Sequence, residues 1–322
     1  GTDPFTGSAR STSMGNTHLL NSSGSANTRF NPTNLTSLDS QLDIQIDQLS
    51  MFERWSMPVR DSFGEFLTNA DYVANEFNYY GFRGGITVNT NLFGLGRTGL
   101  GAHYAPLSHF TYHYVEEVRG DNKIEDGELA SKDPIVGFQN LSTDGSLMVS
   151  SLGGGLQLNA PDVSYLSLGG SINFIQSMKI SDRIGIDTLL DFNVTNLSTY
   201  PNVYQAKMTP ESDFMTLSIK FNHKSFFEIA ASWESKAKCA TKIYDWSIDS
   251  TSGLLQYWDD STYEDSTFYA VKGINYVKPE LKSLAINYIA DSKQTMSISF
   301  ELNEVIYNNH QIFQNYNIYK FG

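Results

Sequence analysis

Residues 216–222 read Thr-Leu-Ser-Ile-Lys-Phe-Asn and change between polar and apolar at every step. Residues 41–47 (QLDIQID) and 295–302 (TMSISFEL) alternate in the same way. Because successive side chains of a β-strand point to opposite faces, such a strand meets an apolar phase on one face and a polar phase on the other. This pattern is typical of a transmembrane β-barrel that has lipid outside and polar groups or water inside.

The rest of the chain agrees with one large β domain. Its 322 residues contain no apolar run long enough for a transmembrane helix. A chain that crosses a membrane without such a helix must form a closed barrel, because hydrocarbon cannot satisfy open backbone groups. The 18 Tyr and 20 Phe residues suit the aromatic girdles of such a barrel, although a soluble β-sandwich can also be rich in tyrosine.

Charge and cysteine content narrow the partners and the chemistry. The net charge of −13 argues against nucleic acid, which needs a basic surface. The single cysteine, Cys239, excludes an internal disulfide and is expected to be inert within a strand. Residues 1–4 lack the basic and apolar regions of a signal peptide, so export is inferred rather than visible.

The chain divides into two parts. Residues 1–38 are small and polar, and we expect them to form a separate N-terminal segment, with the barrel over residues 39–322. Within the barrel, large loops are expected at 119–142 and 197–212, and a short amphipathic helix at 62–72. About 12 to 14 strands are predicted, at 40–50, 78–92, 98–118, 144–159, 163–178, 183–196, 213–223, 225–235, 237–250, 263–277, 281–291, 294–307 and 310–322.

Glycines interrupt several predicted strands. A glycine inside a strand marks a bulge, a bend or the close approach of another segment. Simple curvature and a segment lodged against the wall are both open interpretations here. The positions concerned are Gly81, Gly84, Gly85, Gly99, Gly101, Gly153, Gly154, Gly155, Gly169 and Gly170.

Residues 8–35 resemble the N-terminal signature of the FadL/PorV-like outer-membrane proteins. In that family a small-residue stretch containing Met-Gly-Gly-Ala is followed by an aromatic residue and Asn-Pro-Ala-Gly-Leu. The chain matches at Ala9-Arg10, Met14-Gly15, Ala26, Asn31-Pro32 and Leu35. It departs at Asn16-Thr17 and Thr33-Asn34, and the match covers about a tenth of the chain.

The resemblance implies a barrel of about 14 strands in the bacterial outer membrane, with the N-terminal segment folded into the lumen as a plug. On this basis Met14, Gly15, Asn31 and Pro32 are expected to position the plug. Read without the resemblance, Asn31-Pro32 is an ordinary turn, since proline fixes its own φ and restricts the residue before it.

No catalytic residue, metal ligand or cofactor is predicted, and we expect no enzyme. In a strand His109 and His113 would share a face, which can serve a metal site but is more simply a polar lumen face. No nucleophile elbow, phosphate-binding loop or paired-cysteine site occurs in the sequence.

Two functions follow from the resemblance: passive transport of hydrophobic small molecules through a plugged barrel, and a surface receptor or shuttle role in protein secretion. The alternatives are a structural or adhesive surface barrel and a soluble secreted β-sandwich. The expected partners are outer-membrane lipid, a hydrophobic ligand in the lumen, and the secretion machinery or an exported protein.

Overall fold

The structure, a computed structural model, describes residues 11, 13–60, 63–91, 96–119, 135–159, 164–188, 202–223, 226–247, 275–289, 297–307 and 314–321. Short helical turns come first, at α2 (His18–Asn21), η1 (Gly24–Ala26), α3 (Asn27–Phe30) and η2 (Pro32–Ser37). The strands of the described part are β1 (Gln41–Arg60), β2 (Phe66–Asn91), β3 (Arg97–His109), β4 (Tyr112–Arg119), β5 (Ile135–Asp144), β6 (Ser146–Asn159), β7 (Tyr165–Ile175), β8 (Met178–Thr188), β9 (Asn202–Pro210), β10 (Phe214–His223), β11 (Phe227–Glu234), β12 (Ala237–Ser247), β13 (Tyr276–Lys278), β14 (Glu280–Ile289), β15 (Ser297–Ile306) and β16 (Tyr316–Phe321).

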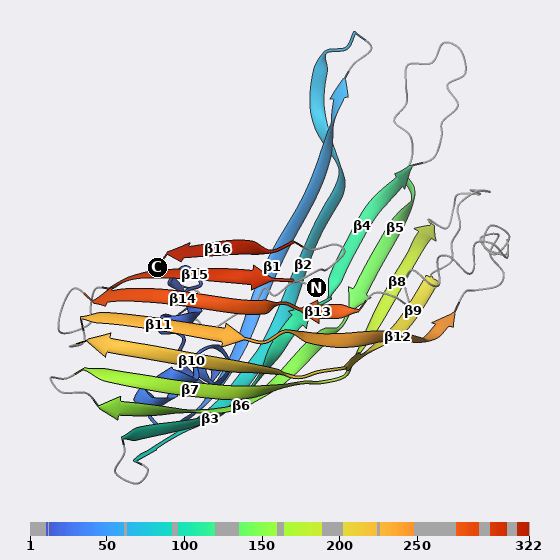
Figure 1. The fold of residues 1–322 in the computed structure, drawn as a ribbon. Helices are drawn as coiled ribbons and strands as arrows, with labels where there is room; N and C mark the ends of the chain where they lie inside the picture. The colour runs from blue at the N-terminus through green and yellow to red at the C-terminus, as the bar shows by residue number, and fades with distance from the viewer. Residues whose placement is uncertain are drawn as a thin grey trace.

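The strands form two antiparallel sheets (Figure 1). The larger has ten strands in the order β1-β2-β3-β6-β7-β10-β11-β14-β15-β16, and the smaller has six in the order β13-β12-β9-β8-β5-β4. The two sheets are linked by six pairs of consecutive strands, each separated by a short break of one to three residues, as at Gly145 between β5 and β6. We call each such pair of strands a broken pass of the chain. Neighbouring passes run in opposite directions. Each broken pass contributes one strand to the larger sheet and one strand to the smaller sheet.

The ten-stranded sheet has the opposite polarity to that of a water-soluble β protein. In β10, Thr216, Ser218, Lys220 and Asn222 are buried, whereas Met215, Leu217, Ile219 and Phe221 are 40% to 51% exposed. Several other strands carry the same exposed apolar side chains, which include Leu42, Ile44, Ile46, Phe82, Ile86, Leu100, Leu152, Leu168, Ile172, Leu284 and Ile298. We call the polar, buried side the inner face and the apolar, exposed side the outer face.

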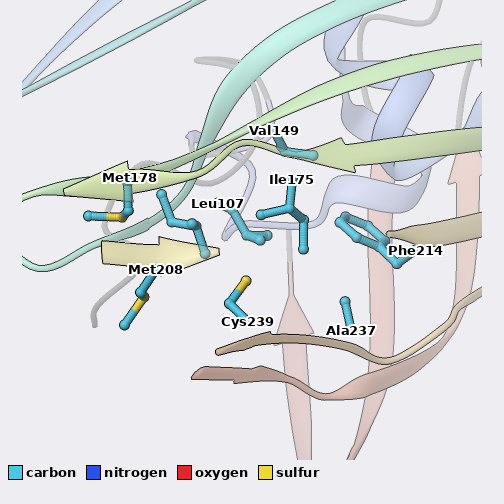
Figure 2. Packing of buried hydrophobic residues seen from close by; sticks show 9 residues of the cluster. Leu107, Val149, Ile175, Met178, Met208, Phe214, Ala237 and Cys239 are labelled. Atoms are coloured by element: carbon cyan, nitrogen blue, oxygen red, sulfur yellow. The ribbon is translucent and has the colours of Figure 1, made fainter. Parts of the chain in front are cut away.

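A cluster of buried apolar side chains lies where the passes break (Figure 2). It joins the ends of β3, β6, β7 and β10 to the beginnings or ends of strands in the smaller sheet. Fully enclosed members such as Leu147 and Cys239 pack against their neighbours with no exposed surface. We name it the apolar cluster; its members are Leu107, Leu147, Val149, Ile175, Met178, Met208, Phe214, Ala237 and Cys239.

The hairpin of β1 and β2 extends beyond the ten-stranded sheet (Figure 1). The two strands pair from Gln41–Thr87 to Arg60–Phe66, whereas the pairing of β2 with β3 ends at Gly84–Tyr104. Pro58 lies within β1, which a proline tolerates because β1 is an edge strand with a neighbour on one side only.

Three local predictions are wrong. Phe66 to Tyr72 belong to β2 rather than to an amphipathic helix, because they pair with the far half of β1. The predicted loops at 119–142 and 197–212 contain β5 and β9, whose cross-strand pairing overrides their turn residues. The strand predicted at 263–277 is a different case, because residues 263–274 lie outside the described residues; its end coincides with β13, Tyr276–Lys278, and the rest stays a prediction.

The all-β, antiparallel character predicted from the sequence is confirmed. Within the described residues, β1 pairs only with β2 and β16 only with β15, so hydrogen bonding does not join the two ends of the sheet. Closure into a barrel and the count of about 14 strands stay predictions. No helix of the described part is long and apolar enough to cross a bilayer.

Candidate functional site: the N-terminal segment on the inner face

The candidate site is the contact between the inner face and residues 11 and 13–37, which we call the N-terminal segment. Its short helices touch strands across the ten-stranded sheet: η1 contacts β1, β2 and β3, η2 contacts β2, β3, β6, β7 and β10, and α2 contacts β11, β14 and β15. In Figure 1 this segment, in dark blue, lies behind the strands β10 to β15. Many of its polar side chains are fully buried, among them Asn27, Asn31 and Thr33.

Three charged side chains of the wall hold the segment at three positions. The Asp43 carboxylate in β1 accepts hydrogen bonds from the Ser25 backbone N–H at 2.8 Å and from the Ser25 hydroxyl at 2.7 Å. The Glu301 carboxylate in β15 accepts one from the Leu19 N–H at 2.8 Å. The Lys220 ammonium in β10 donates to the Asn34 Oδ1 at 2.8 Å. Hydrogen bonds that involve a charged group are the stronger kind, at about 1.5–3 kcal/mol each.

These contacts require the sheet to curve around the segment. In a flat sheet β1 and β15, eight strand spacings apart, would lie about 38 Å from each other. Leu19 and Ser25, which contact β15 and β1, are joined by a stretch of chain that spans at most about 21 Å. The inner face is therefore concave, and the segment lies in the concavity.

Most buried charges of the wall, including Lys220 and Glu301, are also paired with one another. Arg83 Nη2 lies 2.6 Å from Asp47 Oδ2, and Lys278 Nζ lies 3.0 Å from Glu234 Oε2. Lys320 Nζ lies 3.0 Å from Glu301 Oε1, and Lys220 Nζ lies 4.0 Å from Glu228 Oε1. The wall therefore balances most of its own charge, and the segment adds neutral hydrogen-bonding groups and one buried cation, Arg29.

Phe214 connects the polar layer to the apolar cluster. Its ring belongs to the cluster, yet the Lys278 ammonium lies 4.4 Å and the Arg29 guanidinium 5.9 Å from the ring centroid. Both distances are in the range of cation–π attraction. The interior is therefore built in two layers, with the N-terminal segment in the polar layer and the apolar cluster next to it at the strand breaks.

Asn31 and Pro32, two of the residues predicted to position the segment, lie in its buried centre. The Asn31 Nδ2 donates to the Leu19 carbonyl at 2.5 Å, and its Oδ1 accepts from the Thr33 hydroxyl at 2.6 Å and from the Thr33 N–H at 3.3 Å. Pro32 is the first residue of η2, where its missing N–H leaves no donor unsatisfied. Asn31 thus ties two turns of the segment together.

Met14 and Gly15, the other two predicted residues, form a turn at the beginning of the segment. The Met14 carbonyl accepts from the Thr17 hydroxyl at 2.8 Å and from the Thr17 N–H at 3.3 Å. Gly15 has φ 65° and Asn16 has φ 61°, in the left-handed region that glycine and asparagine adopt most readily. The structure does not bring this turn into contact with the Asn31-Pro32 turn through any hydrogen bond of the described residues.

The glycines of the wall provide the surface on which the segment lies. A Cβ added at Gly169 would lie 2.5 Å from the Thr33 nitrogen and 2.6 Å from the Pro32 carbonyl carbon. Close approach of the segment also occupies the space above Gly85, Gly99, Gly101 and Gly155. At Gly84, Gly153, Gly154 and Gly170 the nearest atoms belong to neighbouring strands instead. Close approach of the segment therefore accounts for part of the glycine pattern, and at the other positions the wall strands themselves lie close together.

Ser25, Asp43 and His103 come together without forming a catalytic triad. The Ser25 hydroxyl donates to Asp43 and lies 2.9 Å from His103 Nδ1, so the serine sits between the other two groups. In a hydrolase triad the histidine occupies the middle position and its serine is open to substrate. Here Ser25 has no exposed surface, so the three residues link the segment to β1 and β3.

The two histidines considered for a metal site belong to different strands. His109 is the last residue of β3, and its Nδ1 lies 2.8 Å from the Ser146 hydroxyl. His113 lies in β4, with its Nε2 3.6 Å from Asp144 Oδ1. Among the described residues, no three His, Cys, Asp or Glu side chains are grouped to hold a metal ion.

Comparisons of the chain with protein-family models, with curated proteins and with solved structures gave no match.

Gly169 and Gly170 provide a matched pair that tests the contact with the segment. We expect Gly169→Ala to destabilise the fold by about 1–3 kcal/mol, because the new methyl group overlaps Pro32 and Thr33. Gly170→Ala should have little effect, since its Cβ makes only ordinary van der Waals contacts, with Leu217 Cδ2 at 3.4 Å and the Thr216 carbonyl oxygen at 3.7 Å. Chemical denaturation of the two variants measures the difference, and equal stabilities would contradict the packing of the segment on β7.

His18 makes the attachment of the segment sensitive to pH. Its ring stacks on Phe30 at 5.2 Å, and burial, with the positive charges of Lys320, Arg29 and Arg83, lowers its pKa from 6.5 to about 3. The bound segment therefore keeps His18 neutral, whereas a detached segment takes up a proton below pH 6.5. We expect attachment to be fully stable above pH 6.5 and to weaken up to about tenfold for each pH unit below it.

Hydrogen exchange of the segment's amides between pH 7.5 and 4.5, corrected for the intrinsic exchange rate, measures this loss. His18→Gln removes this titrating group, so the variant should be less stable at neutral pH and clearly less dependent on pH over this range. His103 of β3, which contacts Ser25 of the segment, accounts for the dependence that is left. A wild-type profile as flat as that of the variant would contradict the role of His18.

Proposed function

We propose that the chain is a bacterial outer-membrane β-barrel protein whose ten-stranded sheet lies in the lipid bilayer. The observation that carries this proposal is the inverted polarity of the sheet, with Leu217, Ile219 and Phe221 outside and Ser218 and Lys220 inside. Soluble monomers rarely expose a continuous apolar surface larger than a few hundred Å². Lipid is the surrounding phase that suits an outer face that is apolar on strand after strand.

The dimensions of the sheet support the same proposal. Ten residues, the length of β10, span about 33 Å along the strand. At the tilt of about 45° usual for membrane barrels, this gives about 23 Å across the bilayer, close to the usual apolar band of about 25 Å. In the proposed barrel the curved sheet closes by bringing β1 and β16 together.

The lengths of the connections support an orientation. At one end of the ten-stranded sheet, β2–β3, β6–β7, β10–β11 and β14–β15 are joined by 5, 5, 3 and 7 residues. At the other end, β4–β5, β8–β9 and β12–β13 are joined by 15, 13 and 28 residues. Outer-membrane barrels have short periplasmic turns and longer extracellular loops, so the six-stranded sheet would face the outside of the cell.

Passive transport of hydrophobic small molecules is the activity that the interior favours. The apolar cluster lies on the loop side of the N-terminal segment. A channel for water-soluble solutes would be expected to have a polar lining at this position instead. Binding sites for small molecules are mostly apolar with a few polar groups, which is the composition at the boundary around Phe214. The resemblance of residues 8–35 to the FadL/PorV-like proteins agrees with this activity.

A second candidate is a surface receptor or shuttle role in protein secretion. It is favoured by the β structure that continues beyond the end of the ten-stranded sheet, namely the six-stranded sheet and the far half of the β1–β2 hairpin. Such an extension can contact a secretion-machinery component or an exported protein outside the bilayer.

Replacement of Leu217 by arginine tests whether the outer face lies in lipid. Leu217→Arg should cost about 2–4 kcal/mol of folding free energy in bilayers if Leu217 lies near the middle of the membrane. An arginine introduced on a water-exposed surface should leave the folding free energy nearly unchanged, as we expect for Thr209→Arg on the exposed side of β9. Refolding into lipid vesicles at graded urea concentrations measures both, and a neutral Leu217→Arg would overturn membrane insertion.

Removal of residues 1–35 tests transport. The wall should still fold, since the Arg83–Asp47, Lys278–Glu234 and Lys320–Glu301 pairs do not include the segment. We expect vesicles that contain the shortened chain to become more permeable, and heat-modifiable migration on a denaturing gel to report the folded wall. A folded wall with unchanged permeability to apolar dyes and to small solutes would contradict a segment that controls passage and would favour the receptor role.

A further inference from the structure

A second cluster of side chains lies past the polar layer, where β1 meets the smaller sheet. Glu53 in β1 accepts a hydrogen bond from the Trp55 indole N–H at 3.0 Å through Oε1. Its other oxygen, Oε2, accepts from the Tyr112 hydroxyl of β4, also at 3.0 Å. One carboxylate thus fixes two aromatic rings that come from different strands.

This cluster does not belong to an aromatic girdle on the lipid side. Along β1, Asp43 and Asp47 point to the inner face, where they contact Ser25 and Arg83. Glu53 and Trp55 lie at odd-numbered positions of β1, like Asp43 and Asp47, so their side chains point to the same face. The pairing of β1 with β2 first shifts in register after Trp55, so the alternation is uninterrupted up to that residue. Their side chains therefore face the interior side of the proposed barrel, at its loop end.

The rings are held in place but not covered. Trp55 is 53% and Tyr112 38% exposed, whereas a purely structural anchor between β1 and β4 would bury them. No Lys, Arg or His of the described residues lies within 4.0 Å of the Glu53 carboxylate, unlike the inner-face carboxylates of Asp47, Glu228, Glu234 and Glu301. The cluster therefore combines open aromatic faces with a negative charge that has no cationic partner.

We propose that Glu53, Trp55 and Tyr112 form a binding site for an organic cation of the quaternary ammonium type. Such cations bind over the faces of Trp and Tyr rings through cation–π attraction, and a nearby carboxylate adds a favourable charge. The net charge of −13 would raise the local concentration of cations at the surface. The site goes beyond the proposed transport and does not depend on membrane insertion.

The state of Tyr112 supports this geometry. Burial raises its pKa, and the hydrogen bond to Glu53 and the charge of Glu53 raise it further. The phenol therefore stays protonated at neutral pH and donates to Glu53, which holds the carboxylate in its position between the rings.

Tetramethylammonium, with tert-butanol as the neutral molecule of similar shape and sodium as a small cation, tests the site. Tryptophan fluorescence and calorimetry of the full chain should show saturable binding of tetramethylammonium alone. Glu53→Gln, which removes the charge and keeps the shape, and Trp55→Leu should each weaken binding roughly tenfold. Phe52→Leu is the matched control, because Phe52 is the exposed neighbour on the opposite face of β1.

Several results would overturn the proposal: no saturable binding to the wild-type chain, equal binding of tert-butanol, or unchanged affinity in Glu53→Gln. Binding of a neutral sugar in preference to tetramethylammonium would assign the aromatic faces to another ligand and also overturn it. If either variant does not fold, the comparison of the charged and neutral probes on the wild-type chain decides. A neutral effect of Leu217→Arg, which would overturn membrane insertion, would leave the measured binding of tetramethylammonium and its interpretation unchanged.

Discussion

The burial of polar groups on the inner face is the constraint on which the rest of the structure depends. A buried hydroxyl, amide or charge without a partner costs several kcal/mol, so a concave polar wall must be filled by water or by protein groups that complement it. The N-terminal segment supplies such groups with Asn, Ser and Thr side chains and with backbone N–H groups, as at Ser25 and Leu19. The described part of the segment contains no carboxylate, so it satisfies charged wall residues without burying further negative charge.

The wall is prepared for this segment by two features that act together. Pairs such as Arg83–Asp47 and Lys278–Glu234 balance charges within the wall. Asp43, Lys220 and Glu301 hold specific positions of the segment, and the latter two also have a charged partner in the wall. Glycines in β3, β6 and β7 remove side chains where η2 approaches the sheet, so the backbone of the segment and that of the wall come into contact. The charged residues thus set the position of the segment along the wall, and the glycines set how closely the segment approaches it.

The sequence predicted the fold class and the apolar outer face because period-2 alternation depends only on neighbouring residues. The three residues that hold the segment, Asp43, Lys220 and Glu301, lie at polar positions of the three runs that predicted the fold. A charged residue on the polar side of a strand was the signal that could have singled them out. It was missed because alternation alone does not separate a charge that faces water from one that faces protein.

Other features depended on contacts between distant parts of the chain. The strands β5 and β9 lie in stretches with turn residues, and only pairing with β4, β8 and β12 makes them strands. The breaks that separate the two sheets are marked by no single residue type, since they fall at Gly145 in one pass and at Ser235-Lys236 in another. Asn31 and Pro32, predicted as turn residues, lie at the start of η2, but the groups that they contact, Leu19 and Gly169, could not be predicted from local sequence.

The order of the two interior layers has an energetic consequence for the proposed transport. An apolar molecule that enters from the loop end meets the apolar cluster first, where it can exchange one set of apolar contacts for another. The N-terminal segment comes next, and its contacts with Asp43, Lys220 and Glu301 are charge-assisted hydrogen bonds that such a molecule cannot replace. At about 1.5–3 kcal/mol each, three such contacts amount to about 5–9 kcal/mol, which corresponds to an open fraction of roughly one in a few thousand or less. Spontaneous opening at that level is rare, so transport through the proposed barrel would require a ligand or partner that binds more tightly when the segment has moved than when it is in place.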